Sequence, residues 1–291
     1  MTFLSQKGDV EMKVLVTGVN GQLGHDVVIE CEKVGINAIG VDVEEMDITN
    51  KEAVEKVITS FDVDAVIHCA AYTAVDAAED NVEACTKVNV DGTKNIAEVC
   101  KALDIKMMYF STDYVFEGTG DNFWKETDEC NPRSVYGRTK YEGEQVVSSL
   151  VDKHFIVRIS WVFGVNGNNF VKTMLRLGKE RGAVSVVNDQ IGSPTYTYDL
   201  SKLIVKMIQT EEYGIYHASN DGICSWYDFA CEIFKQAGMD VEVTPVDSST
   251  FPAKAKRPAN SRLSKEALNK HGFQQLRPWQ EALTRYLKEI L

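Results

Sequence analysis

Tyr136 and Lys140 are the residues of this sequence whose types and spacing most directly suggest proton transfer. They stand four positions apart where a helix is expected, so their side chains would share one helix face. A phenol has a pKa near ~10 and exchanges protons poorly at neutral pH, but an ammonium ion beside it favours the phenolate. Lowering that pKa by ~3 requires about 4 kcal/mol, which close charges can supply in a partly dry site. The spacing therefore predicts an acid–base pair, and a Tyr/Lys pair on a solvated helix surface is the plain alternative.

Two hydroxyl groups and a carboxylate, those of Ser111, Thr112 and Asp113, follow a strand expected over 106–110. Parallel strands bring their carboxyl ends to one edge of a sheet, where ligands bind. Capping of a helix or turn would by itself explain these residue types. Because the Tyr/Lys pair and a glycine loop are expected at the same edge, we predict that Thr112 and Asp113 contact a substrate there.

A glycine-rich loop, TGVNGQLG over 17–24, lies between an expected strand and an expected helix. Gly18 permits a tight turn, Gly21 lets the backbone approach a diphosphate at the helix N-terminus, and Gly24 lets the helix pack against the strand. This placement predicts that the loop, Asn20 included, binds a dinucleotide. A merely structural turn is the alternative.

Asp42 ends the second expected strand, where an acidic side chain would accept hydrogen bonds from the ribose hydroxyls of an adenosine. The alternative is a solvated carboxylate at a strand end. Residues 19–32 contain no Lys or Arg, so no nearby cation would balance a ribose 2′-phosphate. We therefore predict NADH as the preferred cofactor, with NADPH left open.

Short apolar runs alternate with segments of helical period over the first 160 positions. Continuous apolar strands between helices predict an α/β fold with a Rossmann-like, doubly wound parallel sheet covered on both faces. The strands are expected at 13–17, 38–41, 65–69, 106–110 and 155–158, and the helices at 22–34, 51–59, 79–102 and 136–150.

The rhythm loosens after about residue 165, which predicts a smaller, mixed α/β lobe that binds the substrate. The helices expected there are at 168–180, 198–209, 225–237 and 279–290, and the strands at 184–187, 215–217 and 241–244. The predicted organisation is an N-terminal extension over 1–11, a dinucleotide-binding domain over 12–165 with a returning piece near 197–217, and a substrate lobe over 166–196 and 218–291. A ligand cleft is expected between the two lobes.

The composition is that of a globular protein, with 291 residues of which 44% are hydrophobic and 25% charged. The 31 basic and 43 acidic residues give a net charge of −12, which repels phosphate backbones and anionic lipid, so neither a nucleic acid nor a membrane is expected as a partner. Seven scattered cysteines without a CxxC pair indicate reduced thiols, and no apolar run is long enough to span a bilayer. A cytoplasmic location is expected, and the oligomeric state stays open, a homodimer included.

Several motifs extend these features into a family pattern. With YxxxK at 136–140 and Thr112 upstream, the sequence resembles the extended short-chain dehydrogenase/reductases. Within that superfamily it is similar to the dTDP-4-dehydrorhamnose reductase family over nearly the whole chain after Met12. The segments that carry this similarity are AAYTAVD (70–76), STDYVF (111–116), SWVFG (160–164), NNFV (168–171), DQIGSPT (189–195) and RPANS (257–261).

The resemblance implies NAD(P)H-dependent reduction of the C4 ketone of dTDP-4-dehydro-L-rhamnose to dTDP-L-rhamnose, a nucleotide sugar used in polysaccharide biosynthesis. It implies that Tyr136 protonates the C4 oxygen, that Lys140 lowers the pKa of Tyr136 and holds the nicotinamide ribose, and that Thr112 hydrogen-bonds the substrate. Asn89 matches the helix asparagine that relays protons in the family. Trp161 would face the deoxysugar ring.

The resemblance also implies a lining for the dinucleotide, made of Gly21, Gln22, Leu23, Asp47, Ile48, Ala70, Ala71 and Tyr72. Two departures from the family pattern are Tyr72, where relatives often carry His, and Glu117, which replaces a usual Asp. Some relatives hold Mg²⁺ between subunits. No carboxylate cluster in this sequence can be assigned to it, so no metal site is expected.

Residues 254–262 carry four cations and no acid in a chain that is strongly acidic. A solvated basic turn is the plain interpretation. The alternative is that this basic segment binds the diphosphate of a nucleotide sugar, with Arg257 as a planar contact that offers several donors.

Two other functions stay open. A catalytically silent regulatory subunit of the methionine adenosyltransferase type shares this fold and much of the motif pattern, although the full set of Thr112, Tyr136 and Lys140 favours an enzyme. Another nucleotide-sugar 4-ketoreductase, an epimerase or a 4,6-dehydratase is the third candidate. Dehydratases carry an acid where Tyr114 stands, so elimination would lack its acid–base partner.

Overall fold

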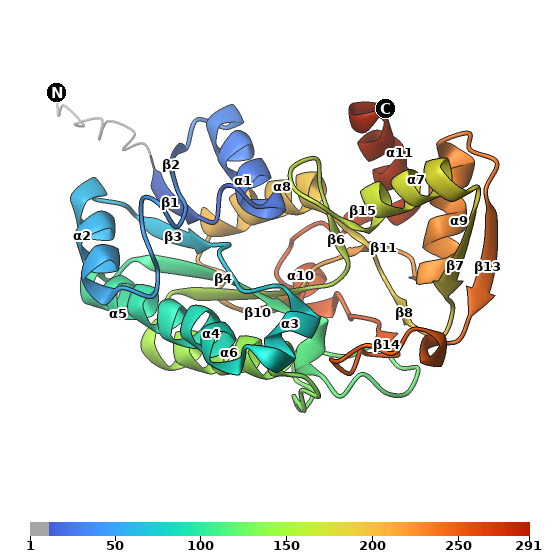
Figure 1. The fold of residues 1–291 in the computed structure, drawn as a ribbon. Coiled ribbons are helices and arrows are strands. Elements are labelled where there is room, and N and C mark those ends of the chain that lie inside the picture. Colours follow the sequence, from blue (N-terminus) through green and yellow to red (C-terminus); the bar gives the residue numbers. More distant parts are fainter. Residues whose placement is uncertain (1–11) are drawn as a thin grey trace, which may run out of the picture.

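A six-stranded parallel sheet forms the centre of the computed structural model, which describes residues 12–291 (Figure 1). The strand order is β10-β5-β4-β3-β1-β2, and every neighbouring pair is parallel. The strands are β1 (Lys13–Thr17), β2 (Asn37–Val41), β3 (Ala65–His68), β4 (Lys106–Thr112), β5 (His154–Ile159) and β10 (Gly214–His217). The predicted doubly wound α/β fold is therefore confirmed. The extension predicted over 1–11 lies outside the described residues.

Helices cover both faces of the sheet. They are α1 (Gln22–Lys33), α2 (Lys51–Phe61), α5 (Thr93–Leu103), α6 (Val135–Leu150), α8 (Thr197–Ile208) and α10 (Glu266–Lys270). Successive strand side chains point to opposite faces, so Val14 and Val16 pack with α1, α8 and α10, whereas Leu15 packs with α2, α5 and α6. Figure 1 shows α1 and α8 on one side of the sheet and α5 and α6 on the other. Apolar residues at alternate positions thus serve two separate cores.

The continuous helix predicted over 79–102 is wrong. The segment forms α3 (Val75–Asp80), α4 (Val82–Thr86), a π-helix η1 (Lys87–Gly92) and then α5. Asn81 leaves the helical region at φ −121° and ψ 50°, and its side-chain amide donates to Ala77 O at 2.8 Å. A polar side chain that bonds the nearby backbone competes with helix formation, and a single π-turn hardly disturbs the apolar periodicity. Neither interruption is visible as a change of period.

The rest of the chain packs beside the sheet around an apolar cluster of its own. Three helices contribute to it, α7 (Phe170–Arg181), α9 (Trp226–Gln236) and α11 (Trp279–Ile290). Two strands pair parallel at its outer edge, β7 (Ala183–Val187) and β13 (Glu242–Val246). The shorter elements are η2 (Asp113–Val115), β6 (Val162–Phe163), β8 (Ile191–Gly192), β9 (Thr195–Tyr196), β11 (Asn220–Asp221), β12 (Cys224–Ser225), η3 (Ser248–Thr250), β14 (Asn260–Ser261) and β15 (Leu276–Pro278).

Residues 197–217 return to the sheet after the chain has started this second cluster. Helix α8 packs against α1, and β10 extends the sheet beside β5. The chain thus crosses between the sheet and the second cluster more than once, which holds both sides of the space between them in place. Within the described part of the chain, no helix combines the length and the apolar character needed to cross a membrane.

Candidate active site

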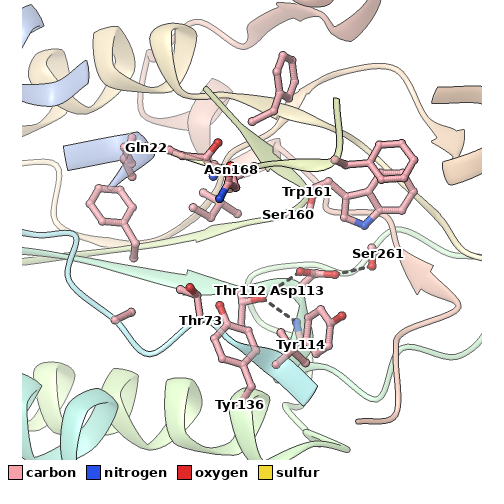
Figure 2. A pocket seen from close by; sticks show the side chains of 18 of the residues that line it. Gln22, Thr73, Thr112, Asp113, Tyr114, Tyr136, Ser160, Trp161, Asn168 and Ser261 are labelled. Carbon is pink, nitrogen blue, oxygen red and sulfur yellow. Dashed lines mark hydrogen bonds between the residues drawn. The ribbon is translucent and has the colours of Figure 1, made fainter. Parts of the chain in front are cut away.

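A cleft of about 1020 Å³ opens at the carboxyl ends of the sheet strands. Strand β1 lies between β2 and β3, and ligands of open α/β sheets bind where the strand order reverses in this way. We call one part the loop end, lined by the 18–24 loop with Asp42, Ala70 and Ala71. We call the other part the aromatic end, lined by Trp161, Phe170, Trp226 and Phe229. Figure 2 shows Thr112 between Gln22 of the loop end and Trp161 of the aromatic end.

The loop end is packed closely around its glycines. Gly18 has φ +70°, and a Cβ there would lie 2.7 Å from Ala70 N. A Cβ on Gly24 would contact Gly18 O, so α1 lies directly against the turn. Gly21 precedes α1 and offers no side chain to cap the first-turn N–H groups. These N–H groups and the narrow cradle fit the diphosphate of a dinucleotide.

Asp42 lines the loop end from the position after β2. Its carboxylate accepts from Asn20 N at 2.9 Å and from Val43 N at 2.8 Å, which fixes its orientation. The Glu45 carboxylate accepts from the Asp42 N–H at 2.9 Å and adds a second acid at this place. The Asp42 carboxylate therefore suits ribose hydroxyls as a ligand, and the two negative charges together repel a 2′-phosphate.

Tyr136, Lys140 and Thr112 all line the middle of the cleft. Tyr136 and Lys140 lie in the first turns of α6, where the N-cap Ser134 hydroxyl accepts from Gly137 N at 3.1 Å. The Thr112 hydroxyl at the end of β4 lies close enough to the Tyr136 phenol to influence its ionisation. Figure 2 shows the Tyr136 side chain projecting from its helix toward Thr112. The structure therefore brings these three predicted residues together.

Burial acts on both titratable groups of this trio. It raises the pKa of the Tyr136 phenol above its usual range, and the nearby Thr112 side chain offsets only part of that rise. It lowers the pKa of Lys140 to about 7, against the opposing effect of the Glu144 carboxylate. The pKa of Tyr136 thus moves opposite to the direction predicted from spacing, because desolvation of the buried phenol is the largest effect on it. The phenol stays protonated, which is the form that can donate a proton.

Asn89 lies in the π-helix η1, buried behind the wall of the cleft. Its Oδ1 accepts from Tyr72 N at 2.8 Å, and its Nδ2 donates to Tyr72 O at 3.2 Å and to Thr139 Oγ1 at 3.1 Å. The amide therefore ties the segment after β3, which carries the cleft-lining Ala70 and Ala71, to α6. Such π-turns are frequent at functional sites.

Three residues expected along the dinucleotide, Asp47, Ile48 and Tyr72, do not line the cleft. Asp47 is exposed, and its carboxylate accepts from the Thr49 N–H at 2.9 Å and from the Thr49 hydroxyl at 2.8 Å, which lowers the pKa of Asp47. Ile48 is buried against Gly92 of η1. Residues 47 and 48 follow β2 closely in the chain, but their side chains stabilise the turn and the core.

Asp113 is buried and lines the cleft beside Thr112. Its carboxylate accepts from the Thr112 hydroxyl at 3.0 Å and from the Ser261 hydroxyl of β14, as Figure 2 shows. Burial raises the pKa of Asp113 to about 6, although both hydroxyls act in the opposite direction. Ser261 was not predicted as a site residue. Its hydrogen bond links the C-terminal part of the chain to the end of β4.

Arg257 reaches the cleft from the basic segment, but it is not a free cation. Its guanidinium lies 2.6 Å from Asp76 Oδ2 and donates to the Tyr114 hydroxyl at 3.3 Å. Lys254 pairs in the same way with Asp80. Two ion pairs therefore join the basic segment to α3. The Lys254 side chain is still 62% exposed, so the plain interpretation as a solvated turn fits Lys254 and not the cleft-lining Arg257. In this structure the Arg257 N–H groups that could bind an anionic ligand are donated to Asp76.

The aromatic end contains the predicted Trp161 together with three rings that sequence patterns did not assign to the site, those of Phe170, Trp226 and Phe229. Trp161 and Trp226 stack with ring centroids 3.8 Å apart and planes 15° apart. Phe170 lies 4.6 Å from Trp226, and Phe229 lies 5.6 Å from Phe170. Phe170 belongs to α7, and Trp226 and Phe229 belong to α9. Aromatic residues on amphipathic helices usually belong to a core, so no local signal distinguished these from core residues.

Metal-ligand residues do not gather within residues 12–291, where no three His, Cys, Asp or Glu side chains form a group that could hold an ion. The seven cysteines are unpaired. Cys69 lines the cleft, but burial raises the pKa of its thiol, so the nucleophilic thiolate is disfavoured. The groups poised for chemistry in the cleft are therefore the hydroxyls of Thr112 and Tyr136, the Lys140 amine and the Asp113 carboxyl.

Comparison with known proteins identifies a family for this arrangement. The family model of the RmlD substrate binding domain matches residues 12–291. The chain belongs to this family. The RmlD-family chain is 40% identical over 284 residues to the dTDP-4-dehydrorhamnose reductase of Aggregatibacter actinomycetemcomitans, a match that covers 93% of the chain and 97% of the relative.

Two solved structures are similar to the RmlD-family chain over almost its whole length. A dTDP-4-dehydrorhamnose reductase from Clostridium acetobutylicum is 44% identical, with a TM-score of 0.94 and coverage of 96% of this chain and 99% of that one. The enzyme of the same name from Bacillus anthracis, solved in complex with NADP, is 45% identical, with a TM-score of 0.94 and coverage of 96% and 100%. The resemblance inferred from the motifs is confirmed.

Proposed function

We propose that this RmlD-family protein reduces the C4 ketone of dTDP-4-dehydro-L-rhamnose to dTDP-L-rhamnose, with NADH or NADPH as reductant. The observation that carries the proposal is the meeting of Tyr136, Thr112 and Lys140 beside a glycine loop in one cleft. Reduction of a ketone needs a hydride donor and a proton donor at the same carbonyl. This cleft has a glycine loop suited to bind the dinucleotide that donates the hydride, and a phenol suited to donate the proton. The names of the relatives support the same reaction.

The loop end fits a nicotinamide dinucleotide, which supplies the hydride when it is bound. Backbone N–H groups at the start of α1 would hold the diphosphate, and Asp42 would accept hydrogen bonds from ribose hydroxyls. Asp47, Ile48 and Tyr72 stay outside the proposed contacts because they do not line the cleft. The proposed cofactor-binding residues are Gly18, Asn20, Gly21, Gln22, Leu23, Asp42, Ala70, Ala71, Tyr136 and Lys140.

Tyr136 is the proposed proton donor to the C4 oxygen. Its phenol is protonated at neutral pH because burial raises its pKa, and the Thr112 hydroxyl lies beside it. Lys140, with its pKa lowered to about 7, gains and loses a proton near neutrality and can restore the phenol. Asn89 bonds Thr139, the neighbour of Lys140, and we propose that it continues this proton route.

The sugar nucleotide would occupy the rest of the cleft, between Thr112 and the aromatic end. Thr112 and Asp113 offer a hydroxyl and a carboxyl to the hexose, and Trp161 offers an apolar face to its ring. Arg257 would exchange its pairing with Asp76 for the diphosphate of the substrate. These four contacts are proposals, and we call the part of the cleft that these residues line the substrate side.

The test is to incubate the protein with dTDP-4-keto-6-deoxy-L-mannose and NADH, and to follow NADH absorbance and product formation. Wild type should oxidise NADH and form dTDP-L-rhamnose. Tyr136→Phe should still bind NADH and lose about 1000-fold in kcat, within the usual range for removal of a positioned acid. Wild type that binds NADH without oxidising it would overturn the proposal in favour of a regulatory subunit.

A dehydratase has less support from the same residues. Tyr114 stands where an acid–base group would be needed, its hydroxyl is engaged by Arg257, and burial raises its pKa to about 12. An epimeric 4-ketoreductase remains a variant of the same chemistry. The stereochemistry of the isolated product distinguishes the two reductases.

We also propose the division into a dinucleotide-binding part (12–165, with 197–217) and a substrate part (166–196 and 218–291). The return of α8 and β10 to the sheet supports it. A cytoplasmic location is supported by seven unpaired cysteines. A homodimer is the assembly to examine by size-exclusion chromatography with light scattering.

A further inference from the structure

Trp161 holds an unusual backbone conformation at the aromatic end of the cleft. Its φ is +49°, in the left-handed region that bulky residues rarely adopt. The other described non-glycine residues with positive φ, Asp62 and Asp104, are helix C-caps, where this conformation is common. A strained residue at a ligand cleft persists only when its surroundings over-determine it.

The backbone around Trp161 is clamped by the neighbouring chain. Thr195 N donates to Trp161 O at 3.1 Å, and the Thr195 hydroxyl donates to Ser160 O at 2.5 Å. The Ser160 hydroxyl donates to Ser193 O at 2.8 Å. These contacts fix where the Trp161 side chain leaves the backbone, but they do not fix the plane of its indole.

Trp226 supplies that second constraint. Its ring stacks on Trp161 at 3.8 Å and is itself backed by Phe170 at 4.6 Å. Gly192 of β8 lies against the same indole. A Cβ at this position would be 2.9 Å from Trp161 Cε2, so the glycine leaves just enough room for the ring. Trp226 is the first residue of α9, which a capping box between Ser225 and Asp228 anchors. The ring that backs Trp161 is therefore carried by a fixed helix start.

We propose that Trp226 is a positioning residue for the sugar: it fixes the indole plane of Trp161, and the stacked pair forms the wall that recognises the apolar face of a 6-deoxyhexose. The proposal rests on the proposed function, since it requires a dTDP-sugar in this cleft. An aromatic wall holds the C–H face and methyl group of a deoxysugar by burial of apolar surface, and it contributes nothing to binding of the nucleotide part. The contribution of Trp226 should therefore appear in sugar affinity alone.

The experiment compares the affinities for dTDP and dTDP-L-rhamnose by calorimetry, which needs no turnover. In wild type the sugar should tighten binding relative to dTDP. Trp226→Leu should reduce this gain about tenfold and leave the affinities for dTDP and NADH unchanged, as expected for loss of one stacked aromatic pair. Its circular dichroism spectrum should also lose the exciton couplet that two stacked indoles produce.

Trp226→Tyr keeps a ring that can stack and should reduce the gain by no more than about threefold. Trp279→Phe is the matched control, because this buried tryptophan packs edge-on to Phe229 at 5.5 Å without lining the cleft. An unchanged ratio of the two affinities in folded Trp226→Leu, or in Trp226→Tyr should the leucine variant not fold, would overturn the role of Trp226. Wild type that binds both ligands but does not oxidise NADH would instead overturn the proposed function.

Discussion

The loop end of the cleft is built from backbone, whereas the substrate side is built from side chains. At the loop end, contiguous residues 18–24 expose N–H groups because glycines leave room for them. On the substrate side, Trp161 is held by Trp226 and Arg257 by Asp76, from segments far apart in the chain. Backbone recognition requires a local motif, and side-chain recognition requires a folded second cluster. The two sides should therefore fail under different substitutions.

The largest effect is expected for Asp113, the buried carboxyl of the substrate side, on the pH dependence of the free energy of unfolding. Burial raises the pKa of Asp113 from 3.8 to about 6, so between these values the folded protein keeps a proton that the unfolded chain has released. The free energy of unfolding should therefore fall as pH rises from ~4 to ~6, by about 3 kcal/mol from this group. Urea unfolding across this range should show the fall in wild type and not in Asp113→Asn. Parallel pH profiles for the two proteins would contradict the prediction, and Asp121→Asn, at an exposed position, is the control.

The backbone character of the loop end is tested by Gly18→Ala. The new Cβ would have to occupy a left-handed conformation 2.7 Å from Ala70 N, so the cradle must shift. We expect the Kd for NADH to rise about 100-fold, as strain and clash together allow, while dTDP affinity is unchanged. Gly120→Ala is the control, because Gly120 has a similar φ of +76° but nothing lies within 4 Å of an added Cβ. This variant introduces the same backbone strain without filling the cradle, so it should leave NADH affinity unchanged. Unchanged NADH affinity in a folded Gly18→Ala protein would argue against the loop as the diphosphate site.

Arg257→Ala tests the opposite side of the comparison. Loss of the guanidinium should raise KM for the keto-sugar about tenfold and hardly change KM for NADH, because the proposed contact is to the substrate diphosphate. Lys254→Ala is the matched control, since Lys254 pairs with Asp80 in the same segment but does not line the cleft. Equal increases in both KM values for Arg257→Ala would contradict the assignment.

The smallest effect concerns the choice of dinucleotide at the loop end. Asp42 lines the cleft where the adenosine ribose would lie, and Glu45 adds a second negative charge beside it, so kcat/KM should be higher with NADH than with NADPH. Asp42→Ala should reduce the ratio of kcat/KM for NADH to kcat/KM for NADPH about fivefold, which corresponds to the loss of roughly one hydrogen bond. Steady-state kinetics with both cofactors measures it, with the exposed Glu44→Ala as control. A wild-type preference for NADPH would show that the acids do not govern selection.

Sequence reasoning succeeded where a feature depends on neighbours within a few positions. The strand–loop–helix around Gly18 and the spacing of Tyr136 and Lys140 are of this kind, and each lines the cleft. It failed at the helix over 79–102, because a backbone interruption at Asn81 leaves the apolar period intact. It also predicted the wrong direction for the pKa of Tyr136, because spacing shows the ammonium but not the burial of the phenol.

By itself, the order of amino acids determined the parallel sheet, the glycine turn and the shared helix face of Tyr136 and Lys140, since alternation, glycine placement and helical spacing are local physical constraints. Only the tertiary structure decided that Ser261 bonds Asp113, that Asp76 holds Arg257 and that Trp226 stacks on Trp161. These contacts join segments that approach each other only after the second cluster has packed beside the sheet. Their partners are set by the packing of whole helices and loops, and no short pattern along the chain records that packing.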